Sequence, residues 1–250
     1  MHRAIVVTAH LFFVLILTTP AGLLAQDEHT VEKQTVRNEG EVSYINTSGN
    51  TEVQTLSVKN RLEADLSARD MLTWKTSALY AESDGEKTAE QYATSLRWDH
   101  SYSDRTFSYL HAGWNKDEFK GIDNRYYGGI GAGYKILVGP SHFWMGEAGV
   151  DWAFEDYTRG GEDNFPRGRM FTEYEHKFTE DTSFVQSVEG LMSLVDAEDY
   201  RVISETSVVT ALTEILSLKT SYEVAYDNLP EPETLDETDT VFRVALVINI

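Results

Sequence analysis

The sequence predicts an all-β fold: a single closed antiparallel transmembrane β-barrel of twelve strands, preceded by a signal peptide. Three observations indicate this fold. Apolar and polar residues alternate through most of the chain from residue 40 to residue 250, which is the pattern of half-buried strands. The apolar faces of the predicted strands carry no Asp, Glu, Lys or Arg. Trp and Tyr residues occur at both ends of these faces, as a bilayer with two interfaces selects.

The first 25 residues have the three regions of a secretory signal peptide. Arg3 supplies the basic start, residues 4–17 form an apolar run, and Ala25 offers a small residue for cleavage. The alternative, a membrane anchor, needs an apolar run of roughly 20 residues. We therefore predict cleavage near Ala25. The predicted divisions are a signal peptide at 1–25, a polar extension with room for a short helix at 26–39, and a barrel at 40–250.

The composition excludes several classes of protein. The chain has 250 residues, with 41 acidic and 21 basic ones, and a formal net charge of −20. Nucleic-acid binding needs a basic surface, so we expect no nucleic-acid partner. The chain has no cysteine, which excludes disulfides and thiolate metal sites. We predict no metal and no cofactor.

Twelve strand-like segments follow one another between turn residues. Most have the roughly 9–11 residues that a tilted strand needs to cross a bilayer. Tight connections alternate with longer ones at 82–90, 116–124, 155–167 and 227–240, although two connections of the longer set are also short. Short periplasmic turns and longer outer loops are typical of outer-membrane barrels. The predicted strands span residues 40–47, 53–66, 71–82, 90–100, 105–116, 124–138, 142–155, 167–178, 182–195, 199–212, 215–227 and 240–250.

The two faces of each predicted strand differ in polarity. In the last strand, Phe242 and Val244 lie on one face and Arg243 on the other. The two faces of segment 105–116 cannot be assigned, because both are largely apolar. A soluble barrel would bury its apolar face, but the aromatic residues at both ends favour lipid outside and charge inside. We therefore expect the lumen to be lined by Lys59, Arg61, Glu63, Lys75, Arg97, Arg125, Lys135, Glu147, Asp151, Glu173, Glu175, Glu189, Arg201, Glu205, Lys219, Glu223 and Arg243.

Three stretches of the sequence carry a family resemblance. They are the segment from Gly40 through the Thr-Ser-Gly-Asn-Thr turn at 47–51, the arginine-plus-glycine strand at 124–134, and a closing hairpin from Ser221 to Thr240. Together they resemble the salt-induced outer-membrane protein family, a YdiY-like family with a domain of unknown function. The resemblance covers about residues 40–250. It implies an outer-membrane barrel and offers no established activity or substrate.

The histidines give no catalytic arrangement in the sequence. His100, His142 and His176 fall near predicted periplasmic ends, where an interfacial role explains them. A lipid-facing hydrolase would need Ser and His on one face. Ser108 and His111 are three residues apart and face opposite ways. We therefore predict that the protein is not an enzyme, and an outer-membrane hydrolase is the weakest alternative.

The longer, outer connections are strongly acidic, with 20 acidic and 5 basic residues. Acids at a pore mouth concentrate cations. Solubility and divalent-cation bridging to anionic lipid headgroups are the alternative explanation of these acids. We predict a narrow, cation-leaning passive channel linked to salt or envelope stress. The alternative is a structural barrel without transport, whose ion pairs plug the lumen. Expected partners are outer-membrane lipid and lipopolysaccharide, the barrel-assembly machinery, and small cations or solutes.

Overall fold

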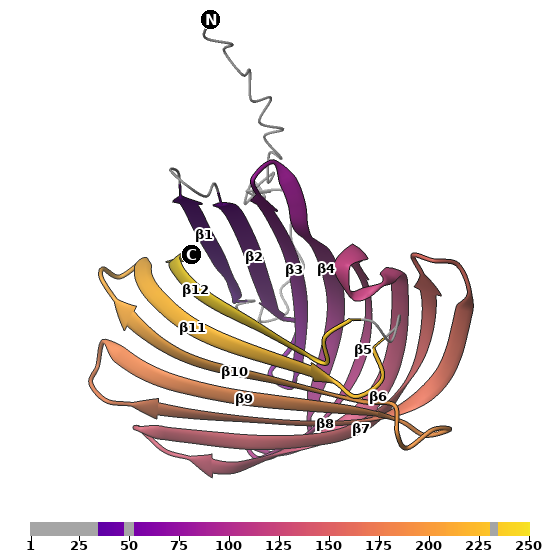
Figure 1. Ribbon diagram of the computed structural model, residues 1–250. Coiled ribbons are helices and arrows are strands. Elements are labelled where there is room, and N and C mark those ends of the chain that lie inside the picture. The colour runs from indigo at the N-terminus through magenta and orange to yellow at the C-terminus, as the bar shows by residue number, and fades with distance from the viewer. Residues whose placement is uncertain (1–34, 48–52, 231–234) are drawn as a thin grey trace, which may run out of the picture. The chain divides into compact units, whose positions relative to one another are not determined.

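The computed structural model describes residues 35–47, 53–230 and 235–250, which form a twelve-stranded antiparallel barrel (Figure 1). The predicted signal peptide and residues 26–34 lie outside this range. Each strand pairs with its sequence neighbours, and β1 also pairs with β12, which confirms the predicted fold class. The elements are β1 (Val36–Thr47), β2 (Val53–Asp65), β3 (Asp70–Ser83), β4 (Glu86–Ser101), β5 (Thr106–Asp117), the 3-10 turn η1 (Glu118–Lys120), β6 (Ile122–Val138), β7 (His142–Tyr157), β8 (Glu162–Lys177), β9 (Thr182–Ser193), β10 (Tyr200–Ala211), β11 (Leu216–Asp227) and β12 (Thr238–Asn249).

No helix among the described residues is both long and apolar enough to cross a membrane.

Several strands extend beyond their predicted bounds. β1 begins at Val36, so the last four residues of the predicted polar extension are strand. β4 begins at Glu86 and β8 at Glu162, about four and about five residues before their predicted starts. Ladder hydrogen bonds continue past the apolar belt toward the rims. There the side chains no longer alternate between lipid on one face and the lumen on the other. Alternation therefore underestimates strand length at the rims.

The long connection predicted at 82–90 is wrong. Only Asp84 and Gly85 join β3 to β4, with φ values of 51° and 82°. A two-residue hairpin of this kind needs positive φ at both positions, which Asp-Gly tolerates. We call the end of the barrel that carries this hairpin and the connections 118–121, 158–161, 194–199 and 228–237 the long-loop rim. The opposite end, with connections 66–69, 102–105, 139–141, 178–181 and 212–215, is the short-turn rim.

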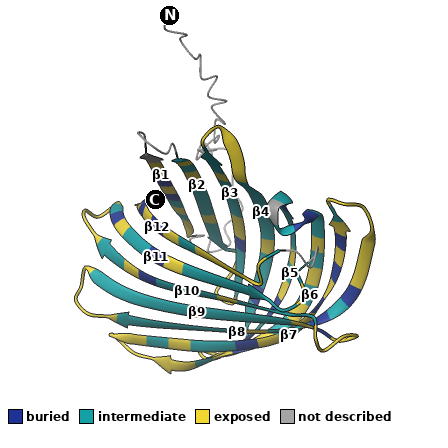
Figure 2. Cartoon of the chain, in the orientation of Figure 1, coloured by how far each residue is buried: buried dark blue, intermediate teal, exposed yellow. Residues whose placement is uncertain are grey.

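The ionic face of the sheet is enclosed. Arg97 of β4 pairs with Glu147 of β7 at 2.8 Å, and Lys59 of β2 pairs with Glu205 of β10 at 3.6 Å. Strands that are not neighbours can exchange such contacts only across the interior. The opposite face carries exposed apolar side chains that alternate along the strands (Figure 2), among them Leu56, Trp74, Leu96, Ile130, Val150 and Phe242.

Two exterior tryptophans pair their indole N–H groups with the neighbouring strand. Trp74 Nε1 donates to Thr94 Oγ1, and Trp144 Nε1 donates to Thr172 Oγ1, both at 2.9 Å. A tryptophan whose polar atom is paired presents mainly apolar surface. These rings therefore suit contact with lipid.

The structure resolves the two faces of β5. Phe107 and Tyr109 are buried inside the barrel, whereas Leu110 is exposed on the exterior. The two rings face Gly133 and Gly131 of β6 across the ladder. A Cβ on either glycine would overlap the facing ring. The glycine-rich strand therefore makes the space that lets β5 turn its aromatic face inward.

The seam that closes the barrel is shorter than the other strand contacts. β1 and β12 share four residue pairs, from Glu39–Asn249 to Val42–Leu246. Every other pair of neighbouring strands shares eleven to fifteen. Beyond Val42–Leu246 no further pair joins the described parts of the two strands.

Candidate functional site

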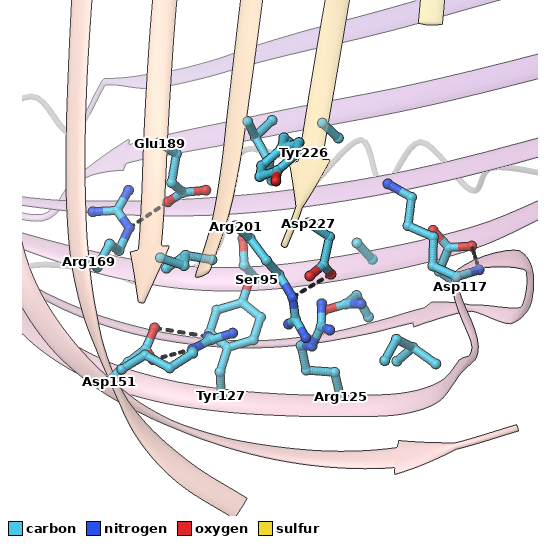
Figure 3. Close-up of a pocket in the computed structure, with 18 of the residues that line it drawn as sticks. Ser95, Asp117, Arg125, Tyr127, Asp151, Arg169, Glu189, Arg201, Tyr226 and Asp227 are labelled. Carbon is cyan, nitrogen blue, oxygen red and sulfur yellow. Dashed lines mark hydrogen bonds and ion pairs between the residues drawn. The ribbon is translucent and has the colours of Figure 1, made fainter. Parts of the chain in front are cut away.

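The barrel interior contains a cavity of about 560 Å³ that is lined by charges of both signs (Figure 3). Its wall comes from the inner faces of most strands between β3 and β12, and from the connection before β12. The charged residues that line it include Lys75, Arg125, Arg169, Glu189, Arg201 and Asp227.

Three buried carboxylates lie on the inner face of β7, and one of them, Asp151, lines the cavity. Glu147, Asp151 and Glu155 are four residues apart, so they share one face of the strand. Their side chains are 0 %, 1 % and 0 % exposed. A buried carboxylate needs charged or hydrogen-bonding partners. Each of the three has at least one arginine.

Glu155 holds two arginines from strands on either side. Arg125 of β6 donates from Nε to Glu155 Oε1 at 2.6 Å, and Arg201 of β10 donates from Nη1 to the same oxygen at 2.9 Å. Arg201 Nε also donates to Asp227 at 2.8 Å. Figure 3 shows Arg125, Arg201 and Asp227 together in the cavity. This group joins β6, β7, β10 and β11.

Asp151 has a two-pronged contact with Arg167 of β8. Nε and Nη2 of the arginine donate to the two carboxylate oxygens at 2.8 and 3.1 Å. This fork is the strongest geometry for such a pair. The guanidinium lies 5.7 Å from the centre of the Tyr127 ring, and His111 Nε2 lies 3.9 Å from Asp151. The Asp151 carboxylate is therefore almost fully buried, with Arg167 and His111 beside it.

Glu147 joins β4 to β8 through two further arginines. Arg97 donates to its two oxygens at 2.8 and 3.0 Å, and Arg169 donates at 2.7 Å. The guanidinium of Arg97 stacks 4.1 Å from the centre of the Tyr109 ring. Arg169 also donates to the Tyr109 hydroxyl at 2.9 Å. The aromatic face of β5 and the acids of β7 thus hold the same two arginines.

A second ionic group lies inside β1, β2, β10, β11 and β12. Lys219 contacts Glu41 at 3.2 Å and Glu205 at 2.9 Å. Glu205 also contacts Lys59 at 3.6 Å and Arg243 at 4.0 Å. This group connects β1, β2 and β12 with β10 and β11.

The structure brings most of the predicted lumen residues into ion pairs. Four make none within the described chain, namely Lys75, Lys135, Glu173 and Glu175; of these, Lys75 lines the cavity. The paired ones are Lys59, Arg61, Glu63, Arg97, Arg125, Glu147, Asp151, Glu189, Arg201, Glu205, Lys219, Glu223 and Arg243.

Sequence reasoning missed two central members of the site. Glu155 and Arg167 were expected at the ends of the strands 142–155 and 167–178, and they were counted with the outer connection instead of the lumen residues. They lie inside β7 and β8. A signal was available, because Glu155 continues the four-residue spacing of Glu147 and Asp151. Tyr109 was missed because the faces of its strand could not be assigned.

The structure also gathers a serine, a histidine and an aspartate on the exterior near the short-turn rim. His100 Nδ1 lies 2.8 Å from Asp70 Oδ1, and Ser108 is the cross-strand partner of His100. The Ser108 hydroxyl instead bonds to that of Tyr102 at 3.0 Å. No hydrogen bond joins Ser108 to His100 within the described residues. The group lacks the contact with a base that activates a serine nucleophile.

Residues 40–250 match the model of a family described as a protein of unknown function, DUF481. The chain belongs to this family. It is also similar to the uncharacterized protein YdiY of Escherichia coli strain K12. The two are 26% identical over 196 residues, which cover 78% of this chain and 76% of that protein.

Several solved barrels are similar in structure at low sequence identity. An outer membrane channel from Pseudomonas putida F1 is 11% identical, with a TM-score of 0.49 over 86% of this chain and 94% of that one. The NanC porin is 9% identical, with a TM-score of 0.46 over 86% and 98% of the two chains. The translocator domain of the autotransporter NalP from Neisseria meningitidis is 9% identical, with a TM-score of 0.46 over 86% and 87%.

Proposed function

We propose that this family member is a narrow passive channel of the bacterial outer membrane with a cation-enriched outer mouth. The observation that carries the proposal is a closed barrel with an apolar exterior and an ionic interior around a cavity. Exposed apolar surface is unfavourable in water, and unpaired charge is unfavourable in hydrocarbon. A barrel of this polarity suits a bilayer, because its apolar side chains face lipid and its ladders pair the backbone groups of neighbouring strands.

The same proposal assigns an orientation and partners. Residues 1–25 direct export, cleavage occurs near Ala25, and the barrel-assembly machinery inserts the mature chain. The short-turn rim then faces the periplasm and the long-loop rim faces outward, against lipopolysaccharide. We connect the channel with salt or envelope stress through the family resemblance alone.

Tryptophan quenching tests the membrane placement. Trp74 and Trp144 are 44% and 42% exposed on the barrel exterior. In reconstituted vesicles we expect brominated lipid to quench their fluorescence and aqueous iodide to leave it nearly unchanged. Iodide quenching, or a monodisperse mature chain in buffer without detergent, would contradict the proposal.

The proposed cation preference comes from the long-loop rim. Inside the barrel the charges largely cancel in pairs such as Arg125 with Glu155. At the rim Asp239 pairs with Lys120 at 3.2 Å, whereas exposed Asp236 has no partner within the described chain. Acids without a counter-charge raise the local cation concentration. The mouth therefore sets the sign of the selectivity.

Planar-bilayer recordings in a salt gradient test the channel. We expect small, steady openings whose reversal potential favours cations. Asp236→Asn should move the reversal potential toward zero. Asp181→Asn removes an exposed acid from the short-turn rim and is the matched control, expected to have a smaller effect. Equal effects of the two variants would contradict the assignment of selectivity to the outer mouth.

The plugged barrel remains the second candidate, because ion pairs cross the interior. Arg97 with Glu147 and Lys59 with Glu205 join strands that are not neighbours. A plug predicts silence of the wild type across voltages. It also predicts currents in Glu205→Gln, which weakens the contact of Lys59 with Glu205 across the lumen.

A further inference from the structure

The pairing of β1 with β12 stops partway along the apolar belt. Extending the register of the last pair, Val42–Leu246, would place Ser43 opposite Ala245 and, four residues on, Thr47 opposite Val241. None of these five further pairs forms between the described parts of the two strands. The exterior of this region is apolar, since Tyr44 and Phe242 are 62% and 60% exposed. The unpaired part of the seam therefore lies where the barrel meets lipid.

The open edges present unpaired backbone groups. Asn38 and Ile250 form a hydrogen-bonded pair, because each donates its N–H to the other's carbonyl oxygen at 2.8 Å. Along an antiparallel ladder, hydrogen-bonded pairs alternate with pairs that are not hydrogen-bonded, so such a pair occurs at every second residue. The even-numbered residues of the seam therefore point their N–H and C=O groups toward the opening. Unpaired backbone groups are strongly unfavourable in hydrocarbon, so these edges need donors and acceptors. The residues concerned are Tyr44, Asn46, Phe242 and Val244.

Some buried polar side-chain atoms beside the opening also have no hydrogen-bond partner among the described residues. They are Oε1 of Glu41, Oγ of Ser221 and Nε of Arg243, on residues only 4%, 2% and 7% exposed. Arg243 faces Ser221 across the β11–β12 ladder. Glu41 reaches the same level through Lys219, which lies opposite Ala245. These atoms gather on the inner side of the seam, at the height where β1 leaves β12.

We propose that the open part of this seam binds an extended polypeptide segment, which adds as a strand along the free edges of β12 and β1. A strand offers backbone donors and acceptors at the spacing of these edges. It also points alternate side chains to opposite faces. Polar ones can reach Glu41 and Arg243, while apolar ones continue the lipid-facing surface beside Tyr44 and Phe242. An acyl chain supplies neither kind of hydrogen bond. This site requires the barrel but not conduction through its lumen.

Cysteine pairs test whether the seam is open. The chain has no cysteine of its own. Glu39→Cys with Asn249→Cys lies in the paired part of the seam, and Ser43→Cys with Ala245→Cys lies at the register position where pairing stops. Both pairs are of the non-hydrogen-bonded class, in which facing side chains are closest. Under mild oxidation in vesicles, we expect the first pair to form a disulfide and the second to form on the order of tenfold less. Equal disulfide yields would overturn the proposal.

A peptide probe tests whether the edge takes a strand. The probe is a synthetic copy of residues 36–47 with cysteine at the position of Ser43, which would face Ala245 in the extended register. Under the same mild oxidation, we expect the full-length Ala245→Cys barrel in vesicles to capture it as a mixed disulfide, and excess peptide without cysteine to compete.

Ala153→Cys is the matched control for the peptide probe, since Ala153 is also a buried inner-face alanine but lies on the fully paired β7. Val241→Cys, with the probe cysteine moved to the position of Thr47, gives a second test if the first variant does not fold. Capture by the control to the same extent, or no capture at either seam position in folded barrels, would overturn the proposal.

Discussion

Replacing Gly131 with alanine should displace the ring that closes the inner wall of the barrel. A Cβ at Gly131 would overlap the ring of Tyr109. The ring has little room to retreat, because its hydroxyl already lies 2.6 Å from where a Cβ on Gly149 of β7 would stand. The two glycines sit on strands held by full ladders. The ring, rather than the backbone, must therefore move.

Three contributions set the size of the effect. Overpacking a filled interior costs about 1–3 kcal/mol. Movement of the ring weakens its stack with Arg97 at 4.1 Å, a contact worth about 0.5–2 kcal/mol. It also strains the hydrogen bond from Arg169, and bonds of this charged kind are worth about 1.5–3 kcal/mol. Because the ring can shift without losing both contacts, we expect a total loss of about 3 kcal/mol.

Urea unfolding in vesicles, followed by tryptophan fluorescence, measures this loss. Gly128→Ala is the matched control on the same strand. The nearest atoms to a Cβ at Gly128 are 3.7 and 3.9 Å away, which is ordinary contact, so we expect a change within about 0.5 kcal/mol. Equal losses for the two variants, or a neutral Gly131→Ala, would refute the argument that inner glycines make room for the aromatic face of β5.

Two further perturbations address the ion pairs. Arg167→Met leaves the Asp151 carboxylate, 1 % exposed, without its two-pronged partner; we expect the free energy of unfolding to fall by about 3–5 kcal/mol, with most of it recovered when Asp151→Leu is added. If Arg167→Met alone lowered the free energy of unfolding only as much as the loss of an exposed ion pair does, the contact of Arg167 with Asp151 would stabilise the barrel little. Hydrogen bonds from Lys116 and Lys87 lower the pKa of Glu118 in the connection after β5, so its contribution to stability is present above the pKa of the unfolded chain and is lost as pH falls through the folded value. Glu118→Gln should therefore reduce the difference in urea midpoint between pH 7 and pH 3, and an unchanged difference would contradict this assignment.

Strand alternation predicts most of this fold because lipid and lumen impose opposite demands on every strand. The prediction failed where a strand does not have lipid on one face and a polar lumen on the other. At the long-loop rim β7 and β8 continue past the predicted strand ends, so Glu155 and Arg167 were counted with the connection between them. On β5 both faces are apolar, and the decision lies in the glycines of β6, which pair with it across the sheet. The faces of β5 therefore cannot be read from that segment alone.

Which charged residues pair in the interior depends on which strands lie opposite one another, and no single strand's sequence contains this information. Parity places Arg97 and Glu147 on inner faces, but they meet because the closed barrel brings β4 opposite β7. The seam illustrates the same limit. β12 alternates as regularly as any strand, with Phe242 and Val244 outward and Arg243 inward, yet its pairing with β1 ends after Leu246. Alternation specifies which face of a strand meets lipid, whereas the directions of two strands decide whether their edges meet. The unpaired edges therefore demand a partner even though every residue along them obeys the pattern of a barrel strand.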